Sequence, residues 1–125
     1  MSFNNSPYHS LHLRKFFPIN KIGVDYVNPF NINIEFKETF SLNPNFKNVN
    51  IKITQNQFTN NDLIVVCFQT TKFYVHNAKL LGKKHCRPNS YGRTTLRAIS
   101  LQKNFMFQTD NYQDLKTYLD NIQEV

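Results

Sequence analysis

Residues 23–37 read GVDYVNPFNINIEFK, and this stretch decides the fold that we expect. It predicts two short strands, over 21–27 and 32–40, joined by a turn at the Asn-Pro pair in its middle. Four apolar side chains mark the buried side of these strands: Val24, Ile32, Ile34 and Phe36. The turn brings the first strand back beside the second one, so the stretch predicts the start of a β-sheet.

Three charged side chains come together in this pair of predicted strands. Side chains alternate across a strand, so Glu35 and Lys37 point to one face while Phe36 points to the other. The turn places Asp25 beside them. Two carboxylates at one spot can hold a hard divalent cation, and a neighbouring lysine can steady an attacking water or the charge that develops on a phosphate. The structural alternative is a cross-strand ion pair, with Asp25 capping a turn.

The acids are unevenly distributed along a basic chain. The 125 residues include 15 Lys and Arg and 8 Asp and Glu, which gives a net charge of +7. Every basic residue except Lys116 precedes position 110, together with only four of the eight acids, and three of those four lie within 25–38. Carboxylates gathered in an otherwise basic chain suit a metal site on a surface that attracts a phosphate backbone.

Helical patterns stand at both ends of the chain. We expect a helix over 7–17, with Ser6 as its N-cap and Pro7 at its first position. A second helix is expected over 110–123, capped by Asp110, because its apolar residues recur on one face.

Strand patterns occupy the middle of the chain. Residues 63–68 form a continuous apolar run, typical of a central strand covered on both faces, and 72–78 are expected to pair with it. Residues 49–58 alternate like a strand, yet they could form a helix laid across the sheet. Both possibilities stay open.

Size and composition indicate a single domain spanning residues 1–125. Its 40% apolar content argues against disorder. No apolar stretch reaches the ~20 residues that a membrane span requires, so no membrane partner is expected. Cys67 and Cys86 show no metal-ligand spacing, which favours an intracellular, cytoplasmic protein with free thiols.

The order of these elements resembles the core of the PD-(D/E)XK nuclease superfamily, the fold of many type II restriction endonucleases and of Holliday-junction resolvases. The resemblance covers roughly residues 7–80. It rests on the predicted first helix, on Asp25, on Glu35-Phe36-Lys37, and on the late strands at 62–66 and 73–75. It implies an α/β (α+β) fold with a mixed central β-sheet flanked by helices, a restriction-endonuclease-like core.

The resemblance also implies roles for individual residues. Asp25 and Glu35 would be metal ligands, the backbone carbonyl of Phe36 would complete the metal shell, and Lys37 would be the catalytic lysine. The expected metal is Mg²⁺, with Mn²⁺ as a substitute, and no small-molecule organic cofactor is expected.

Three further residues could support the metal ligands. Gln55 and Gln57 are candidates to hydrogen-bond to them. Glu38 could replace an acid that many members of the superfamily carry on the first helix, although Glu38 points to the strand face opposite Glu35 and Lys37.

A basic segment follows at residues 79–97, and no acid occurs between 63 and 109. This segment could follow DNA phosphates, with an arginine reaching base edges, or it could be an ordinary solvated surface. Arg14, Lys15 and Lys21 could add to the same face. The candidate DNA-binding residues of the segment are Lys79, Lys83, Lys84, Arg87, Arg93 and Arg97.

The sequence thus favours a magnesium-dependent DNA endonuclease that hydrolyses backbone phosphodiester bonds. An enzyme of this size that cuts both strands would most simply act as a homodimer. The alternative is a non-catalytic basic nucleic-acid-binding protein or an inactive nuclease relative. A weaker alternative is one component of a larger assembly, such as a ribosomal or viral complex.

Overall fold

The computed structural model describes residues 14–22, 24–39, 50–53, 55–68, 72–80, 86–88, 94–97 and 105–125. The elements in chain order are β1 (Tyr26–Val27), β2 (Asn33–Thr39), β3 (Asn50–Ile53), α2 (Gln55–Asn60), β4 (Leu63–Phe68), β5 (Lys72–Asn77), β6 (Cys86–Pro88), β7 (Thr94–Arg97), β8 (Phe107–Thr109) and α5 (Tyr112–Asp120). Residues 14–16 and 78–80 are also helical.

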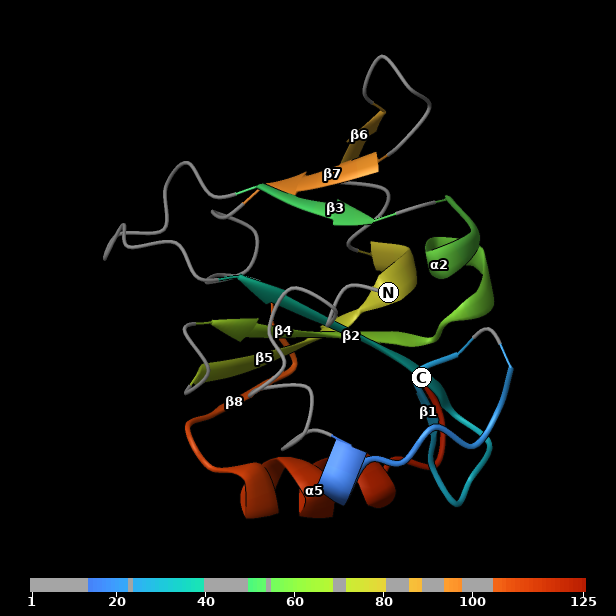
Figure 1. The fold of residues 1–125 in the computed structure, drawn as a ribbon, viewed down its shortest axis with the longest axis vertical. Helices are drawn as coiled ribbons and strands as arrows, with labels where there is room; N and C mark the ends of the chain where they lie inside the picture. The colour runs from blue at the N-terminus through green and yellow to red at the C-terminus, as the bar shows by residue number, and fades with distance from the viewer. Residues whose placement is uncertain are drawn as a thin grey trace.

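Five strands form a mixed sheet in the order β1-β2-β4-β5-β8 (Figure 1). β2 and β4 are parallel, whereas the other neighbouring pairs are antiparallel. Parallel neighbours need a crossover connection, and the chain between β2 and β4 supplies β3 and α2. β3 pairs with β7, which pairs with β6, in a second, three-stranded antiparallel sheet. The predicted α/β (α+β) class with a mixed central sheet is confirmed.

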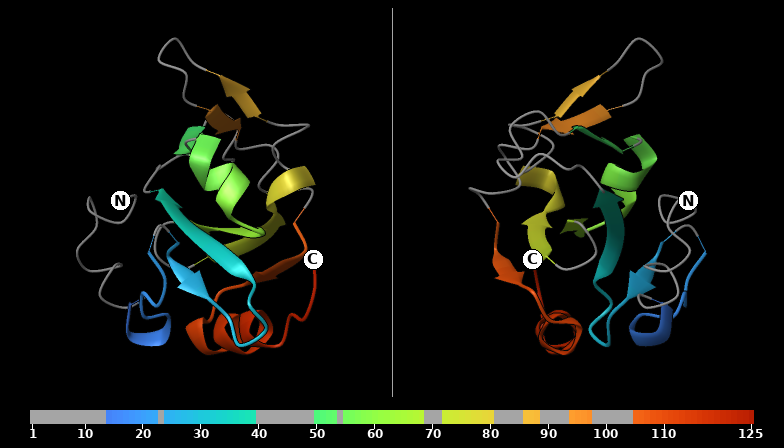
Figure 2. Two further views of the ribbon diagram at one scale, coloured as in Figure 1. Left: turned by 90° about the vertical axis from the view of Figure 1, so that its right-hand side faces the viewer. Right: turned by 60° about the vertical axis from the view of Figure 1, so that its left-hand side comes forward.

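Two layers cover the five-stranded sheet. Figures 1 and 2 show α5 on one side of it and the three-stranded sheet on the other. On the α5 side, Leu115 and Leu119 are fully buried against alternate residues of the strands. The strand residues of this cluster are Tyr26, Ile34, Phe36, Leu63, Val65, Cys67, Phe73 and Val75. This apolar contact is the main favourable contribution to folding.

β4 is the central strand of the sheet. Every residue from Leu63 to Cys67 is 0% exposed. The continuous apolar run is therefore covered on both faces, as predicted. The predicted partner strand is confirmed as β5, which pairs with β4 from Lys72 to Asn77.

The turn between β1 and β2 is held by one buried asparagine. Asn28 Oδ1 accepts hydrogen bonds from the backbone N–H of Phe30 and of Ile32, each at 2.9 Å. Asn28 Nδ2 donates to the carbonyls of Leu119 and Ile122, each at 2.8 Å. The predicted turn is confirmed, and Asn28 also ties it to the end of α5.

The C-terminal helix is shorter than predicted, and the predicted cap is wrong. α5 runs from Tyr112 to Asp120, and its N-cap is Asn111, whose side chain accepts from the N–H of Gln113 and Asp114. Asp110 lies one residue too early, and its Oδ1 accepts from Gln108 Nε2 instead.

Other expected boundaries also change. The first strand, expected over 21–27, is reduced to β1, preceded by an isolated bridge between Lys21 and Val24. The ambiguous stretch 49–58 contains both alternatives, since β3 ends at Ile53 and α2 begins at Gln55. β6, β7 and β8 are strands that the sequence pattern did not predict.

Part of the predicted first helix is described. Residues 14–16 are helical, whereas 7–13 and the expected cap at Ser6 lie outside the described residues. Among the helices that are described, none has the length and apolar content needed to cross a membrane.

Candidate active site

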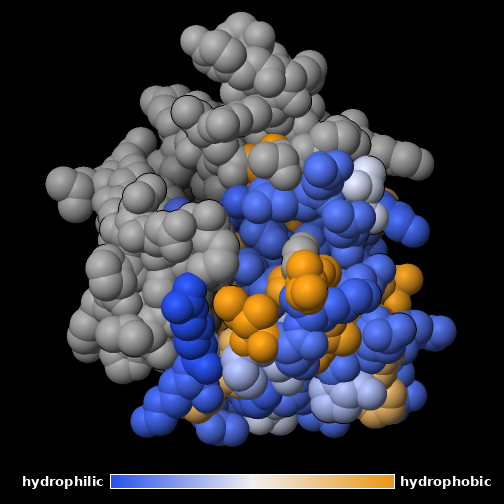
Figure 3. Space-filling view, turned by 45° about the vertical axis from the view of Figure 1, so that its right-hand side comes forward, coloured by the Kyte–Doolittle hydropathy of each residue, from blue (hydrophilic) through white to orange (hydrophobic). Residues whose placement is uncertain are grey.

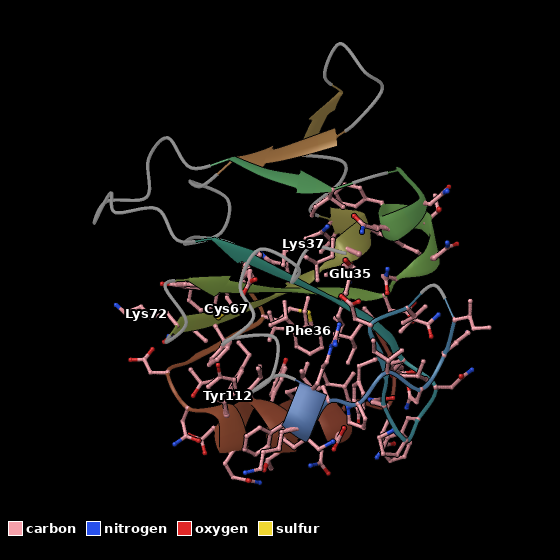
Figure 4. All side chains as sticks on the ribbon, viewed as in Figure 1. Glu35, Phe36, Lys37, Cys67, Lys72 and Tyr112 are labelled. Carbon is pink, nitrogen blue, oxygen red and sulfur yellow. The ribbon has the colours of Figure 1, made fainter. Side chains whose placement is uncertain are left out.

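Glu35 and Lys37 lie side by side on the face of β2 that points away from α5. They are 4% and 5% exposed, and Lys37 Nζ is 3.5 Å from Glu35 Oε2. Phe36 points to the opposite face, into the core (Figure 4). The alternation predicted from the sequence is confirmed, and it makes Glu35 and Lys37 a buried ion pair.

Asp25 joins this pair from the segment before β1. β1 and β2 are antiparallel, with Tyr26 opposite Ile34, so the same register places Asp25 across from Glu35. β1 begins only at Tyr26, and the Asp25 side chain takes up the next hydrogen bond: its Oδ2 accepts from the N–H of Phe36 at 3.0 Å. The predicted convergence of Asp25, Glu35 and Lys37 is therefore confirmed.

The backbone of Phe36 also turns toward Asp25. In a strand, the N–H and C=O of one residue point to the same side. Because the Phe36 N–H points to Asp25, its carbonyl oxygen points to the same edge of β2. This direction fits the predicted role of the Phe36 carbonyl as a third oxygen ligand.

Burial dominates the electrostatics of the two acids. The pKa of Glu35 is raised to about 7, first by burial and then by the neighbouring charge of Asp25. The pKa of Asp25 is also raised by burial, although its hydrogen bond from Phe36 and the charge of Lys37 oppose the shift. The interaction between the two carboxyl groups raises the pKa of Glu35 further and lowers that of Asp25. Without a cation, burial therefore disfavours the charged form of both carboxyl groups.

The pKa of Lys37 shifts in the opposite direction to those of the two acids. Burial lowers the pKa of Lys37, and the negative charges of Glu35 and Asp25 counteract that effect. Buried groups with strongly shifted pKa values and specific charged partners are typical of functional sites.

The two acids open onto a cavity of about 300 Å³. We call it the carboxylate cavity, and its walls are Ile19, Lys21, Ile22, Val24, Asp25, Glu35 and Gln57. Lys37 is not among the lining residues and lies behind Glu35 on the same strand face. Asp25 and Glu35 therefore both border this cavity, Asp25 half-buried and Glu35 buried.

The donor set of this cavity fits a hard cation that keeps much of its own water. Among the described residues, no three His, Cys, Asp or Glu side chains gather into a potential metal site. Mg²⁺ commonly uses one or two carboxylates, with water and substrate oxygens completing its shell. Asp25, Glu35 and the Phe36 carbonyl satisfy that requirement.

The structure places the three candidate supporting residues differently. Gln57 lines the carboxylate cavity from α2. Gln55 is the first residue of α2, and its side chain lies outside the described residues. Glu38 is in register with Cys67 on the face of β2 opposite Glu35, as the strand alternation predicted, which places it away from the carboxylate cavity.

The candidate DNA-binding residues are placed in part. Lys79 is exposed directly after β5. Arg87 lies in β6 and Arg97 in β7, with their side chains outside the described part of the chain. Lys83, Lys84 and Arg93 lie outside it entirely. Figure 4 shows β6 and β7 on the side of the central sheet that carries Glu35 and Lys37.

The apolar wall of the cavity was not predicted from the sequence. Val24 and Ile22 fall within the first predicted strand and Ile19 just before it, and their only signal as cavity residues is that they precede Asp25 closely. No protein-family model, no curated protein and no solved structure matches the chain.

Proposed function

We propose that this protein is a metal-dependent DNA endonuclease of the PD-(D/E)XK type. The observation that carries the proposal is that Asp25 and Glu35 line one cavity, with Lys37 Nζ 3.5 Å from Glu35 Oε2 on the same strand face. The mixed sheet supports it too, since acid-x-Lys lies on a strand next to the parallel central strand. A coincidental ion pair would not require two acids buried against each other.

Each residue has a distinct task in the proposed hydrolysis. Asp25 and Glu35 would hold Mg²⁺, which would supply a Lewis acid for a phosphate oxygen and for water. The Lys37 ammonium stabilises the negative charge that develops on the phosphate. The reaction forms one phosphorus–oxygen bond to water and breaks one to a sugar oxygen, which takes up a proton.

DNA is the proposed substrate because the chain is basic outside its acid cluster. The net charge of +7 attracts a polyanion, and only four of the eight acids precede position 110, two of which, Asp25 and Glu35, line the cavity. Cleavage of both strands needs two such sites, and a symmetric homodimer is the simplest arrangement that supplies them.

The proposal is tested by incubating supercoiled plasmid with the protein in Mg²⁺ or in EDTA. We expect nicking or linearisation in Mg²⁺ alone. Lys37→Ala should lower the rate by about 100-fold or more, because it removes a charge used in the transition state. Lys72→Ala removes an exposed lysine at the first residue of β5, which lies away from Glu35 in Figure 4. This variant should cleave the plasmid like the wild type.

The same experiment separates the alternative function. If the wild type binds the plasmid but leaves it intact in both Mg²⁺ and Mn²⁺, the chain is a nucleic-acid-binding protein without catalysis. Equal cleavage by wild type and Lys37→Ala would contradict the assigned site.

A further inference from the structure

A second cavity lies next to the carboxylate cavity. It has a volume of about 330 Å³, and we call it the side cavity. Its lining residues are Lys21, Ile22, Val24, Asn33, Thr59 and Asn60. Three of them, Lys21, Ile22 and Val24, also line the carboxylate cavity. The two cavities are therefore neighbours with a shared wall, and we refer to them together as the groove.

One side of this groove is an exposed apolar wall. Ile22 is 101% exposed and Ile19 is 52% exposed. Figure 3 faces this side of the molecule and shows a small group of hydrophobic side chains surrounded by hydrophilic ones. Leaving apolar area in water beside a charged site is unfavourable, and a ligand that covers it recovers that free energy.

The other side of the groove is polar. Asn33 Nδ2 donates to the carbonyl of Asn60 at 3.1 Å, which joins the start of β2 to the end of α2. The side chain of Asn60 is exposed at this rim. Amide groups here can hydrogen-bond to the edge of a planar heterocycle.

Among the lining residues of the two cavities, Lys21 has the one positively charged side chain. Lys21 is exposed and lines both, with its Nζ 3.5 Å from Asn33 Oδ1. A phosphate held by Lys21 would connect a group at the carboxylates to a group in the side cavity. In this arrangement one phosphate would lie at the acids, the next at Lys21, and a base beside Ile22.

We propose that the side cavity binds the base of one unstacked nucleotide next to the scissile phosphate, with the base face against Ile22 and its edge toward Asn60. A base inside an intact duplex is stacked on both faces and cannot enter such a groove. Apolar side chains, isoleucine included, insert at base steps in other DNA-binding proteins, and extruded bases pack against apolar walls. The favoured substrate is therefore DNA with an unpaired or easily unstacked nucleotide. This inference rests on the proposed nuclease function.

The test measures binding, so that it stands apart from cleavage. The probes are two DNA duplexes of one sequence, one fully paired and one with a single unpaired 2-aminopurine, whose fluorescence rises when it unstacks. The protein carries Lys37→Ala, so that cleavage in Mg²⁺ is slow compared with the binding measurement. We expect the DNA with the unpaired nucleotide to bind about tenfold tighter or more, since it avoids the cost of unstacking.

Matched variants assign the effect to the groove. Ile22→Ser should reduce the fluorescence rise and remove most of the preference. Phe30→Ser also removes an exposed apolar side chain, 46% exposed and outside both cavities, and should keep the preference. Equal affinity for the two duplexes, or an equal loss for both with Ile22→Ser, would overturn the inference.

Failure of the two proposals can be told apart. If the preference depends on Ile22 but the protein with Lys37 intact cleaves no DNA, the nucleotide site stands and the nuclease proposal falls. If that protein cleaves both duplexes equally and Ile22→Ser changes nothing, the nuclease proposal stands and the nucleotide site falls.

Discussion

At the scale of single residues, the candidate site is held in an unfavourable state that a cation would relieve. Asp25 and Glu35 are buried against each other, and Lys37 alone does not offset the burial of both. Removing carboxylates from water costs free energy unless opposite charge is supplied. A divalent cation between the two acids supplies it, so the same burial that raises their pKa values prepares them to bind metal.

This state makes a prediction about stability and pH. The pKa of Glu35 is raised from 4.5 to about 7, so the folded protein binds this proton more tightly than the unfolded chain. The contribution of this proton to the free energy of unfolding is therefore fully present below pH 4.5 and is lost as the pH rises through 7. Glu35→Gln cannot lose a proton, and above pH 7 in EDTA it should be more stable than wild type by on the order of 1–3 kcal/mol.

Urea denaturation at several pH values measures this difference. Glu124→Gln, which removes an exposed carboxyl near the chain end, serves as the control and should follow the wild type. Mg²⁺ should stabilise the wild type above pH 7 and leave Glu35→Gln unchanged. A wild-type stability that rises between pH 5 and 8 in EDTA would contradict the prediction.

At the scale of elements, the position of Asp25 depends on how β1 is fastened to α5. Tyr26, the next residue, donates from its hydroxyl to Asp120 at 2.7 Å and accepts from Lys116 at 2.9 Å. Lys116 and Asp120 form an ion pair at 2.8 Å, one helical turn apart. Together with the four hydrogen bonds of Asn28, these contacts place the Asp25 end of the hairpin against β2.

Asn28→Ala should therefore weaken both the fold and the site. It removes the partner of two N–H and two carbonyl groups around a residue only 4% exposed, and we expect a loss of about 2–3 kcal/mol in unfolding free energy. At temperatures where the variant is folded, half-maximal cleavage should require more Mg²⁺, because Asp25 is held less firmly.

Asn121→Ala is the matched control for this prediction. Asn121 is exposed, and its Nδ2 donates to the carbonyl of Thr117. The change should stay within about 0.5 kcal/mol and should not alter the Mg²⁺ requirement. An Asn28→Ala variant with wild-type stability and Mg²⁺ requirement would refute the role of the hairpin anchor.

The elements also show where sequence patterns succeed. The alternation of Glu35, Phe36 and Lys37 is local, so it could be predicted from three residues. The apolar run of β4 predicted its burial for the same reason. β8, by contrast, is three residues long and exists because it pairs with β5. The Asn111 cap depends on where the first helical turn begins, which differs by one residue from the predicted start.

At the scale of the whole molecule, the charge distribution should control DNA affinity. Binding releases counterions from the phosphate backbone, so affinity should fall steeply with salt. Lys79 is exposed at the start of the basic segment 79–97. If it contacts a phosphate, Lys79→Ala should reduce the slope of log affinity against log salt by about one unit on any sequence.

Fluorescence anisotropy at several salt concentrations on two unrelated duplexes measures this slope. Lys72→Ala removes an equal charge elsewhere and should keep the wild-type slope. Identical slopes for all three proteins would remove Lys79 from the DNA-binding surface. A loss for Lys79→Ala on one duplex alone would make it a base contact.

The arrangement of the whole molecule explains why the groove could not be predicted from the sequence. The groove brings together Ile22, Glu35 and Gln57, from the segment before β1, from β2 and from α2. Their meeting depends on the crossover between the parallel strands and on the split of residues 49–58 into β3 and α2. A local pattern contains neither piece of information, which is why the carboxylates were predicted and the groove was not.

The central claim is that Asp25 and Glu35 form a metal centre, and a crystal grown with Mn²⁺ tests it most directly. We predict an anomalous density peak about 2.0–2.2 Å from an oxygen of each carboxylate, with the Phe36 carbonyl as a further ligand. Glu35→Gln should abolish the peak under the same conditions. If the wild type shows no peak there and its two carboxyl groups remain hydrogen-bonded to each other, the claim is contradicted.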